Sequence, residues 1–193
     1  MPKKNTKKSP VCRLKCSACP KQKTPANGLY TANVMEHFSK PHNYGKIKNP
    51  DGVGKVGNLV CGDVMWLYIK VGKNKAGKEI IKDIKFETFG CVAAIATSSA
   101  ITDLAKGKTL EEAIKINKQE IVGVLGGLPP IKLHCSVLAA DALAEAIHDY
   151  YTKQKRAIPA DLEEKHQRIK KEKDIVEEKY KDWTQKEEEI HNQ

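Results

Sequence analysis

Five residues of metal-binding types lie at three separate places in the 193-residue chain. Cys61 and Asp63 share the segment VCGD, Cys91 stands in FGCVAA, and His134 directly precedes Cys135 in LHCS. Each cysteine is expected where a strand or a loop meets the next element, and such ends gather at the surface of a domain. We therefore expect the three thiols to meet at one place.

Three thiolates with a carboxylate or an imidazole suit Zn²⁺ or a cluster of iron and sulfide, since both prefer soft sulfur ligands. These cysteines include no close CxxC pair, which counts against a rigid structural zinc site. A helix N-terminus lowers the pKa of a nearby thiol. We therefore expect thiolates at Cys91 and Cys135, which both stand at predicted helix starts.

Each of these residues also has a plainer interpretation. A single cysteine is more often a small buried core residue, and an aspartate after a glycine often caps a turn. His134 and Cys135 are sequence neighbours on a helix and point in different directions, which disfavours a cysteine hydrolase dyad. The plain interpretation is weaker for all three cysteines together than for any one.

A second group of cysteines lies in VCRLKCSACP near the N-terminus, at Cys12, Cys16 and Cys19. This CxxxCxxC spacing resembles the cluster loop of radical-SAM enzymes, but the chain is too short for their large barrel. Three soft ligands at such spacing can hold an additional [4Fe-4S] cluster or zinc, with a fourth ligand from elsewhere. We interpret them as a second metal-binding site, preferably for a cluster, with a redox-sensitive tail as the alternative.

The elements expected to position these residues are strands followed by helices. Residues 63–71 and 79–89 are rich in β-branched and aromatic residues, and the GKNKAGK between them predicts an antiparallel hairpin. The Gly-rich residues 48–58 predict a loop. Helices are predicted from residue 30 to 38, from Cys91 to Gly107, after each of the cap pairs Thr109/Glu112 and Asn117/Glu120, and from the segment 127–143 to about 155.

The net charge of +10 is concentrated in the N-terminal extension, where residues 1–25 carry eight Lys or Arg and no acid. A basic tail more often aids solubility than it binds a particular sequence, and no nucleic-acid motif accompanies it, so nucleic-acid binding is a minor hypothesis. No apolar run reaches the length of about 20 residues that spans a bilayer, and the N-terminus lacks a signal-peptide pattern. We expect a cytoplasmic protein without a membrane partner.

Residues 157–193 predict a charged helix. Leu162, Ile169 and Val176 recur every seven residues, but polar residues occupy the second position of the heptad, which argues against a strong coiled coil. A helix lying on the domain or in solvent is favoured over dimerisation, and a homodimer is left open.

Three stretches, VGNLVCGDVMWLYIKV, IKFETFGCVAAIATSSAITDLAKGKTLEEA and LGGLPPIKLHCSVLAADAL, resemble the IscU/NifU family of iron-sulfur cluster assembly scaffolds. The resemblance covers about residues 29–152. It implies an α+β domain with a small antiparallel three-stranded sheet, the third strand drawn from the loop before Cys61, and helices packed on one face. We expect a flexible extension over 1–26, this scaffold domain over 27–156 and the charged helix over 157–193.

The resemblance assigns roles to residues that match the family's motifs. Its three assembly cysteines fall on Cys61, Cys91 and Cys135, its aspartate on Asp63 and its histidine on His134. Leu128, Pro129, Pro130, Ile131 and Lys132 match the LPPVK segment that in some members is recognised by an Hsp70-type chaperone, with isoleucine here in place of valine. Val92 stands where members often carry a smaller residue.

The implied function is that of a scaffold and carrier rather than an enzyme. A cysteine desulfurase delivers sulfur as a persulfide, for which Cys135 is the predicted acceptor because it stands at a helix start. Fe²⁺ binds among the thiolates, an electron donor such as ferredoxin reduces the sulfur, and the transient [2Fe-2S] cluster passes to apo-protein acceptors. We hypothesise that Asp63, a hard ligand, keeps the cluster labile.

Two other functions stay open at this point. The first is a zinc-bound sulfur-transfer protein of the related SufU type, which uses the same cysteines and aspartate, with Zn²⁺ resident in the site. His134 and the LPPIK segment argue against it, because that branch usually lacks both. The second is an interaction protein that acts through its C-terminal helix.

Overall fold

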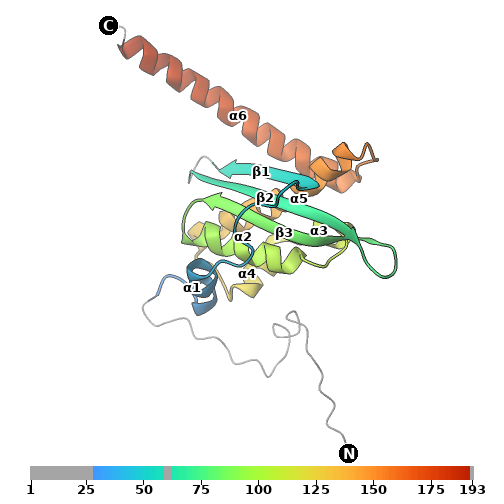
Figure 1. The fold of residues 1–193 in the computed structure, drawn as a ribbon. Helices are drawn as coiled ribbons and strands as arrows, with labels where there is room; N and C mark the ends of the chain where they lie inside the picture. The colour runs from blue at the N-terminus through green and yellow to red at the C-terminus, as the bar shows by residue number, and fades with distance from the viewer. Residues whose placement is uncertain (1–27, 59–61, 192–193) are drawn as a thin grey trace, which may run out of the picture.

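A three-stranded antiparallel sheet forms the centre of the computed structural model, which describes residues 28–58 and 62–191 (Figure 1). The strands are β1 (Gly52–Asn58), β2 (Asp63–Lys73) and β3 (Glu79–Phe89), in the order β1-β2-β3. β2 and β3 pair from Val64 opposite Phe89 to Lys73 opposite Glu79, with one irregularity between Lys70 and Val71. The predicted hairpin is therefore confirmed.

Strand β1 confirms the third strand that the family resemblance implied before Cys61, and it corrects the loop that glycine content predicted over residues 48–58. β1 pairs with β2 from Gly52 opposite Ile69 to Asn58 opposite Asp63. A Cβ atom added at Gly54 would lie 2.0 Å from the carbonyl oxygen of Ala142, so only glycine lets the strand approach the helix behind it this closely. Contacts with the sheet and this helix thus outweigh the low strand propensity of glycine.

All helices except α1 follow the strands along the chain, and the starts of α3 and α4 agree with the predicted caps. Thr109 and Glu112 form a complete capping box, and the Asn117 side chain accepts hydrogen bonds from the backbone N–H groups of Gln119 and Glu120. The helical elements are α1 (Ala32–Ser39), α2 (Val92–Ala105), α3 (Leu110–Ile114), α4 (Lys118–Val124), the 3₁₀ turn η2 (Pro130–Lys132), α5 (Leu133–Lys153) and α6 (Ala160–His191).

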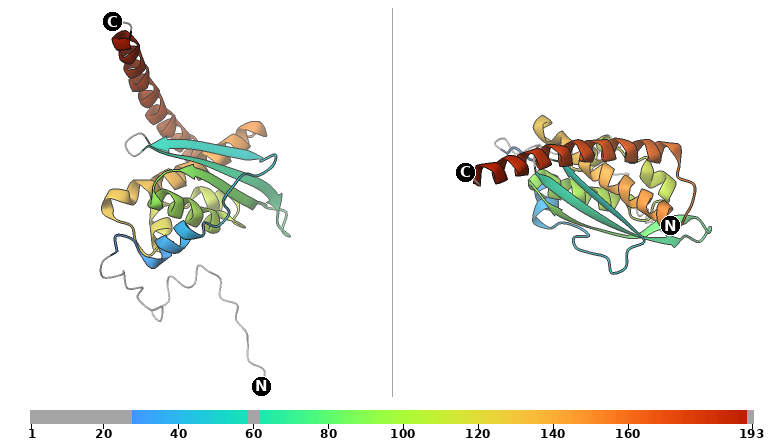
Figure 2. Two further views of the ribbon diagram at one scale, coloured as in Figure 1. Left: turned by 60° about the vertical axis from the view of Figure 1, so that its left-hand side comes forward. Right: turned by 90° about the horizontal axis from the view of Figure 1, so that it is seen from above.

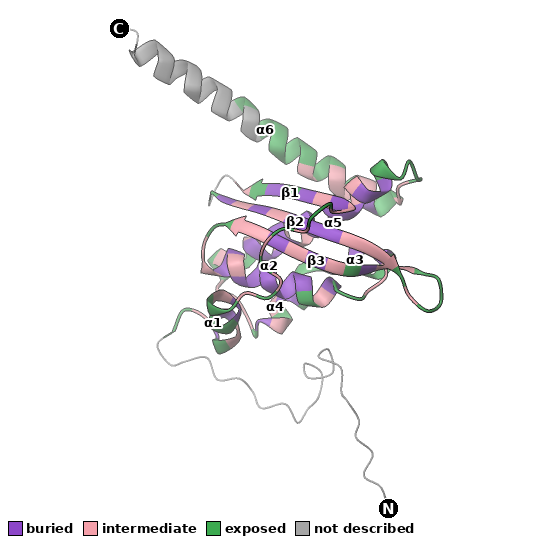
Figure 3. Ribbon diagram, viewed as in Figure 1, coloured by how far each residue is buried: buried purple, intermediate pink, exposed green. Residues whose placement is uncertain are grey.

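Helices α2 and α5 cover one face of the sheet, with α5 against β1 and β2 and α2 against β3 (Figure 2). The core between them contains Met65, Leu67 and Phe86 from the strands and Ile101 and Leu143 from the helices, all at most 1% exposed. Figure 3 shows buried positions on the strands and on helix α2. The α+β class with helices on one face is thereby confirmed.

Helix α6 begins against α5 and then extends away from the sheet (Figure 1). Leu162 in its first turn is fully buried in the main core, and Ile169 packs against that core. Residues 171–175 are exposed. The start of α6 therefore belongs to the packed domain. Among the described residues, no helix is long and apolar enough to cross a membrane.

Candidate metal centre

Asp63, Cys91 and Cys135 converge where the start of β2 meets the starts of two helices. Asp63 is the first residue of β2, Cys91 is the N-cap of α2, and Cys135 lies in the first turn of α5. Oδ2 of Asp63 lies 3.8 Å from Sγ of Cys91 and 3.6 Å from Sγ of Cys135, and the two sulfurs are 3.9 Å apart. The three side chains thus present their donor atoms to one point.

These separations are those of ligands around a single ion. Bond lengths of about 2.3 Å to sulfur and 2.1 Å to oxygen in a tetrahedral site place two sulfurs about 3.8 Å apart and a sulfur and an oxygen about 3.6 Å apart. A disulfide needs a sulfur-sulfur distance of about 2.05 Å, so Cys91 and Cys135 are free thiols. The donor set, with two soft sulfurs and one hard oxygen, suits zinc or iron.

The backbone around Gly90 holds Asp63 in this position. Oδ1 of Asp63 accepts a hydrogen bond of 3.1 Å from the backbone N–H of Cys91, at the start of α2. A Cβ atom at Gly90 would lie 2.6 Å from that same Oδ1 and 2.9 Å from Cβ of Ala94. Glycine at this position therefore lets a 2% exposed carboxylate reach both the helix start and the thiols.

Burial corrects the expectation of a thiolate at Cys135. Its side chain is fully buried, and this burial raises the pKa of the Cys135 thiol far above its ordinary range, with the negative charges of Cys91 and Asp63 adding to the effect. Removal from water therefore outweighs the helix N-terminus. A bound cation would supply the missing positive charge and deprotonate a coordinating thiol.

Lys132 provides a positive charge beside this group. The negative charge of Cys91 is the main cause that raises the pKa of the Lys132 ammonium, and a hydrogen bond to Cys91 contributes. The sequence analysis assigned Lys132 to the LPPIK segment, and it did not predict that Lys132 lies beside Cys91.

His134 lies outside the group formed by Asp63, Cys91 and Cys135. Its Nε2 is buried and, among the described residues, has no hydrogen-bond partner. A buried polar atom without a partner is costly, so this nitrogen needs a partner that the described residues do not supply. Its predicted role as a ligand stays a prediction.

Four predicted ligands fall outside the described residues: Cys61, Cys12, Cys16 and Cys19. Cys61 is two residues before Asp63 in the sequence. The structure therefore shows two of the three predicted thiols, those of Cys91 and Cys135, close together. The place of the Cys61 thiol and the second metal-binding site near the N-terminus stay predictions.

Tyr30 is a neighbour of the site that the sequence analysis did not assign to it. It packs, with Leu128, against the small buried cluster of Ala93, Ala94 and Cys135. Burial raises the pKa of the Tyr30 hydroxyl, and the negative charge of Cys91 is the next cause. Sequence spacing assigned Tyr30 to the apolar face of a helix, whereas the structure places it before the helix, whose N-cap is Thr31.

The profile of the NifU-like N-terminal domain family matches residues 29–157. The chain belongs to this family. Two iron-sulfur cluster assembly scaffold proteins, IscU 1 and IscU 2 of Archaeoglobus fulgidus, are each 58% identical to it over 125 residues, which are 65% of this chain and 78% of the relative. The iron-sulfur cluster assembly enzyme IscU of Drosophila melanogaster is 49% identical over 133 residues, which are 67% and 83% of the two chains.

Among solved structures, the N-terminal part of a nitrogen-fixing NifU-like protein from Brucella abortus superimposes with a TM-score of 0.52. The two chains are 18% identical, and the match covers 65% of this chain and 96% of the other. At this identity the likeness supports the NifU-like fold alone.

The LPPIK segment of this NifU-like domain is accessible beside the metal centre. Pro130 and Ile131 are exposed, Ile131 by 71%, and they form the 3₁₀ turn η2 that leads into α5. Leu133, which follows, is 40% exposed. Apolar side chains in this turn are thus available to a partner.

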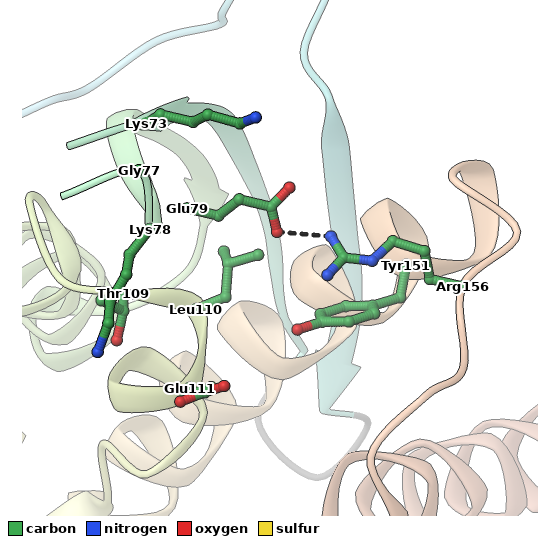
Figure 4. A pocket seen from close by; sticks show the side chains of 9 residues that line it. All are labelled: Lys73, Gly77, Lys78, Glu79, Thr109, Leu110, Glu111, Tyr151 and Arg156. Atoms are coloured by element: carbon green, nitrogen blue, oxygen red, sulfur yellow. Dashed lines mark hydrogen bonds and ion pairs between the residues drawn. The ribbon is translucent and has the colours of Figure 1, made fainter. Parts of the chain in front are cut away.

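A cavity of about 390 Å³ lies apart from the metal centre (Figure 4). Glu79 and Arg156 point at each other across it and form an ion pair of 2.5 Å. Its lining includes no cysteine or histidine, and its residues are Lys73, Gly77, Lys78, Glu79, Thr109, Leu110, Glu111, Tyr151 and Arg156. This cavity therefore offers no thiol or imidazole ligand to a metal ion.

Proposed function

We propose that this chain is a scaffold on which an iron-sulfur cluster is assembled and from which the cluster passes to apo-proteins. The observation that carries the proposal is the convergence of Asp63 with the thiols of Cys91 and Cys135 at ion-binding separations. Relatives that share about half or more of their aligned residues with this chain are named as cluster assembly scaffolds. The iron and the sulfide are cargo, and residues 27–156 form the scaffold unit.

The proposed ligand set for a transient [2Fe-2S] cluster is Cys61, Cys91 and Cys135, with Asp63 or His134. Two points support it. The separations among Asp63, Cys91 and Cys135 match those of ligands to one ion, and Nε2 of His134 is buried without a hydrogen-bond partner among the described residues. Zn²⁺ suits the same donors when no iron or sulfide is supplied.

Sulfur would arrive as the persulfide of a cysteine desulfurase, with Cys135 as the acceptor. The Cys135 thiolate attacks the outer persulfide sulfur, the sulfur-sulfur bond of the desulfurase breaks, and the desulfurase thiolate leaves. Two electrons from a donor such as ferredoxin then release sulfide and restore the Cys135 thiolate. Because Cys135 is buried and its pKa is raised, attack requires a bound cation or an opening of the first turn of α5.

Anaerobic reconstitution tests the scaffold function directly. The metal content of the full chain is measured after purification without oxygen, and Fe²⁺, cysteine and a desulfurase are then added. We expect visible charge-transfer bands that disappear on transfer to an apo-ferredoxin, and a Cys91→Ser variant should lose the bands because it removes a thiol ligand. Retention of one tightly held zinc ion without any bands would instead establish the SufU-type function.

The proposed role of Asp63 is to keep the cluster labile, since a carboxylate is poorly matched to a soft cluster. We predict that Asp63→Ala slows cluster transfer to apo-ferredoxin by about tenfold or more, since changing a residue that only supports a metal ligand already costs about 10- to 100-fold. Transfer is followed by the change in visible circular dichroism. Asp161→Ala, an exposed aspartate of α6, is the matched control. Unchanged or faster transfer from the Asp63 variant would contradict the role.

Further partners of the scaffold follow from its exposed surface. The accessible Leu128–Lys132 segment supports docking of an Hsp70-type chaperone, in which Ile131 would enter an apolar pocket of the partner. We propose a cytoplasmic location.

A further inference from the structure

Three residues far from the thiols form a second group of metal-binding type. His37 lies in the last turn of α1, His42 in the loop that follows, and Asp103 on α2. One nitrogen from each ring and one carboxylate oxygen lie within 4.8 Å of one another. Asp103 follows Cys91 by twelve residues along α2, which is about 18 Å of helix, so the two groups are separate.

Further polar contacts hold each of these three side chains in place. Nδ1 of His37 lies 2.8 Å from Oγ of Ser99, and the same oxygen accepts a hydrogen bond of 2.8 Å from the backbone N–H of His42. Nδ2 of Asn43 donates to Oδ1 of Asp103 over 3.1 Å. Metal ligands usually have such outer partners, which fix the imidazole tautomer and orient the carboxylate.

The exposure of the group suits an ion that also binds water. His37 is 8% exposed, whereas the side chains of His42 and Asp103 are 47% and 39% exposed. The two rings are 4.8 Å apart and tilted by 53°, so they do not stack face to face.

The same contacts can also serve only to hold the loop after α1 against α2, without a metal ion. His42 and Asp103 already form a pair of 2.6 Å, which by itself fastens the loop to α2. That contact between His42 and Asp103 does not explain why Ser99 also holds the imidazole of His37 beside them. Lys106, which contacts Asn43, is paired with Asp83 at 2.8 Å, so its charge is largely offset.

We propose that His37, His42 and Asp103 form a metal site separate from both groups of cysteines, which binds a divalent ion of the Zn²⁺ type with water completing the coordination. Imidazole and carboxylate donors without sulfur suit a single ion of this type and do not suit an iron-sulfur cluster. The site would therefore be filled independently of cluster assembly.

A Co²⁺ titration tests the site with a readout that excludes thiol binding. The probe is Co²⁺ added to the full chain with all six cysteines replaced by serine, in which sulfur-to-cobalt charge-transfer bands cannot arise. We expect one Co²⁺ per chain, detected by its visible d–d bands and displaced by Zn²⁺. His42→Gln and Asp103→Asn keep a polar side chain but remove a donor, and each should weaken binding by about tenfold or more.

His148→Gln is the matched control, because His148 pairs with Glu163 and stacks on His166 outside the group. If the serine variant fails to fold by circular dichroism, the wild-type chain is titrated with Zn²⁺ while the imidazole resonances are followed by NMR, and those of His37 and His42 should shift. Equal affinity in the His42→Gln and His148→Gln chains, or unshifted resonances of His37 and His42, would overturn the proposal.

Discussion

Gly90 determines how closely the Asp63 carboxylate approaches the two thiols. Its missing side chain leaves the space that Oδ1 of Asp63 occupies while it accepts the N–H of Cys91. A position between a strand and a helix that tolerates no Cβ atom thus controls the geometry of the donor group. At this scale the donor types follow from the sequence, but their pKa values depend on burial, as Cys135 shows.

We predict that Gly90→Ala lowers the affinity of the Asp63, Cys91 and Cys135 group for Co²⁺ by about tenfold or more, because the new methyl group displaces the carboxylate. The measurement is a Co²⁺ titration followed by the sulfur-to-cobalt charge-transfer band. Gly123→Ala in α4 is the control, since a Cβ there meets nothing within 4 Å. Equal affinity of the two variants would show that Asp63 does not depend on Gly90.

Helix α5 connects the metal centre to the rest of the fold. Its first turn carries Cys135, its middle packs against the glycines of β1, and its outer side is covered by the first turns of α6. An ion pair joins Arg168 of α6 to Asp141 of α5, and a hydrogen bond joins His166 of α6 to Glu145 of α5. A substitution that disrupts the packing around α5 should therefore lower the free energy of unfolding and also displace Cys135 in the metal centre.

Leu162 provides the simplest test of the packing of α6. It is fully buried in the core, so Leu162→Ala should lower the free energy of unfolding by about 2 to 5 kcal/mol. Ile175 on the same helix is 56% exposed, and Ile175→Ala should change the free energy of unfolding by less than about 0.5 kcal/mol. Urea unfolding measures both, and equal effects would mean that α6 does not pack on the domain in solution.

Glu79 links the start of β3 to the end of α5 and gives a pH-dependent contribution. Its hydrogen bond with Arg156, together with one from Tyr150, holds the pKa of the Glu79 carboxyl below its ordinary value of 4.5. A pKa lowered in the folded state stabilises the protein above about pH 4.5, and this stabilisation is lost as the pH falls through the folded-state value.

We therefore expect Glu79→Gln to lower the free energy of unfolding at pH 7 by at most about 1 kcal/mol, because Arg156 is partly exposed to water. The difference from the wild-type chain should shrink as the pH falls below 4.5, measured by urea unfolding across pH. Glu111→Gln is the control, since Glu111 lines the same cavity without an ion pair to a described residue. A difference that persists at low pH would assign the effect to shape rather than charge.

At the scale of the whole molecule, the described residues form a domain built on a single sheet, from which one helix projects. The first turns of α6 are part of the core, whereas its residues 171–175 are exposed (Figure 3). The metal centre lies at the starts of β2, α2 and α5. Its described ligands, Asp63, Cys91 and Cys135, include no residue of α6.

Two truncations separate these parts. Removing residues 171–193 should leave the free energy of unfolding within about 0.5 kcal/mol and cluster assembly unchanged. Removing residues 157–193 should lower stability by more than Leu162→Ala does, because Ile169 is lost as well, while each folded chain still assembles a cluster. Loss of cluster assembly when only residues 171–193 are removed would favour an interaction protein that acts through its C-terminal helix.

The sequence by itself determined the features that depend on neighbouring residues. The hairpin of β2 and β3, the capping box at Thr109 and the asparagine cap at Asn117 form from side chains and backbone groups a few residues apart, so local spacing was enough. The motifs around Cys91 and Cys135 likewise indicated the family and the donor types.

Only the tertiary structure decided what depends on residues distant in the chain. It showed why a strand forms where the glycine content predicted a loop and only the family resemblance implied a strand: α5 packs where side chains at Gly52 and Gly54 would be. It buried Cys135 and so reversed the expected direction of its pKa, placed Tyr30 beside the thiols, and brought His37 and His42 to Asp103. Burial and convergence are set by how the elements pack against one another, and no stretch of neighbouring residues specifies them.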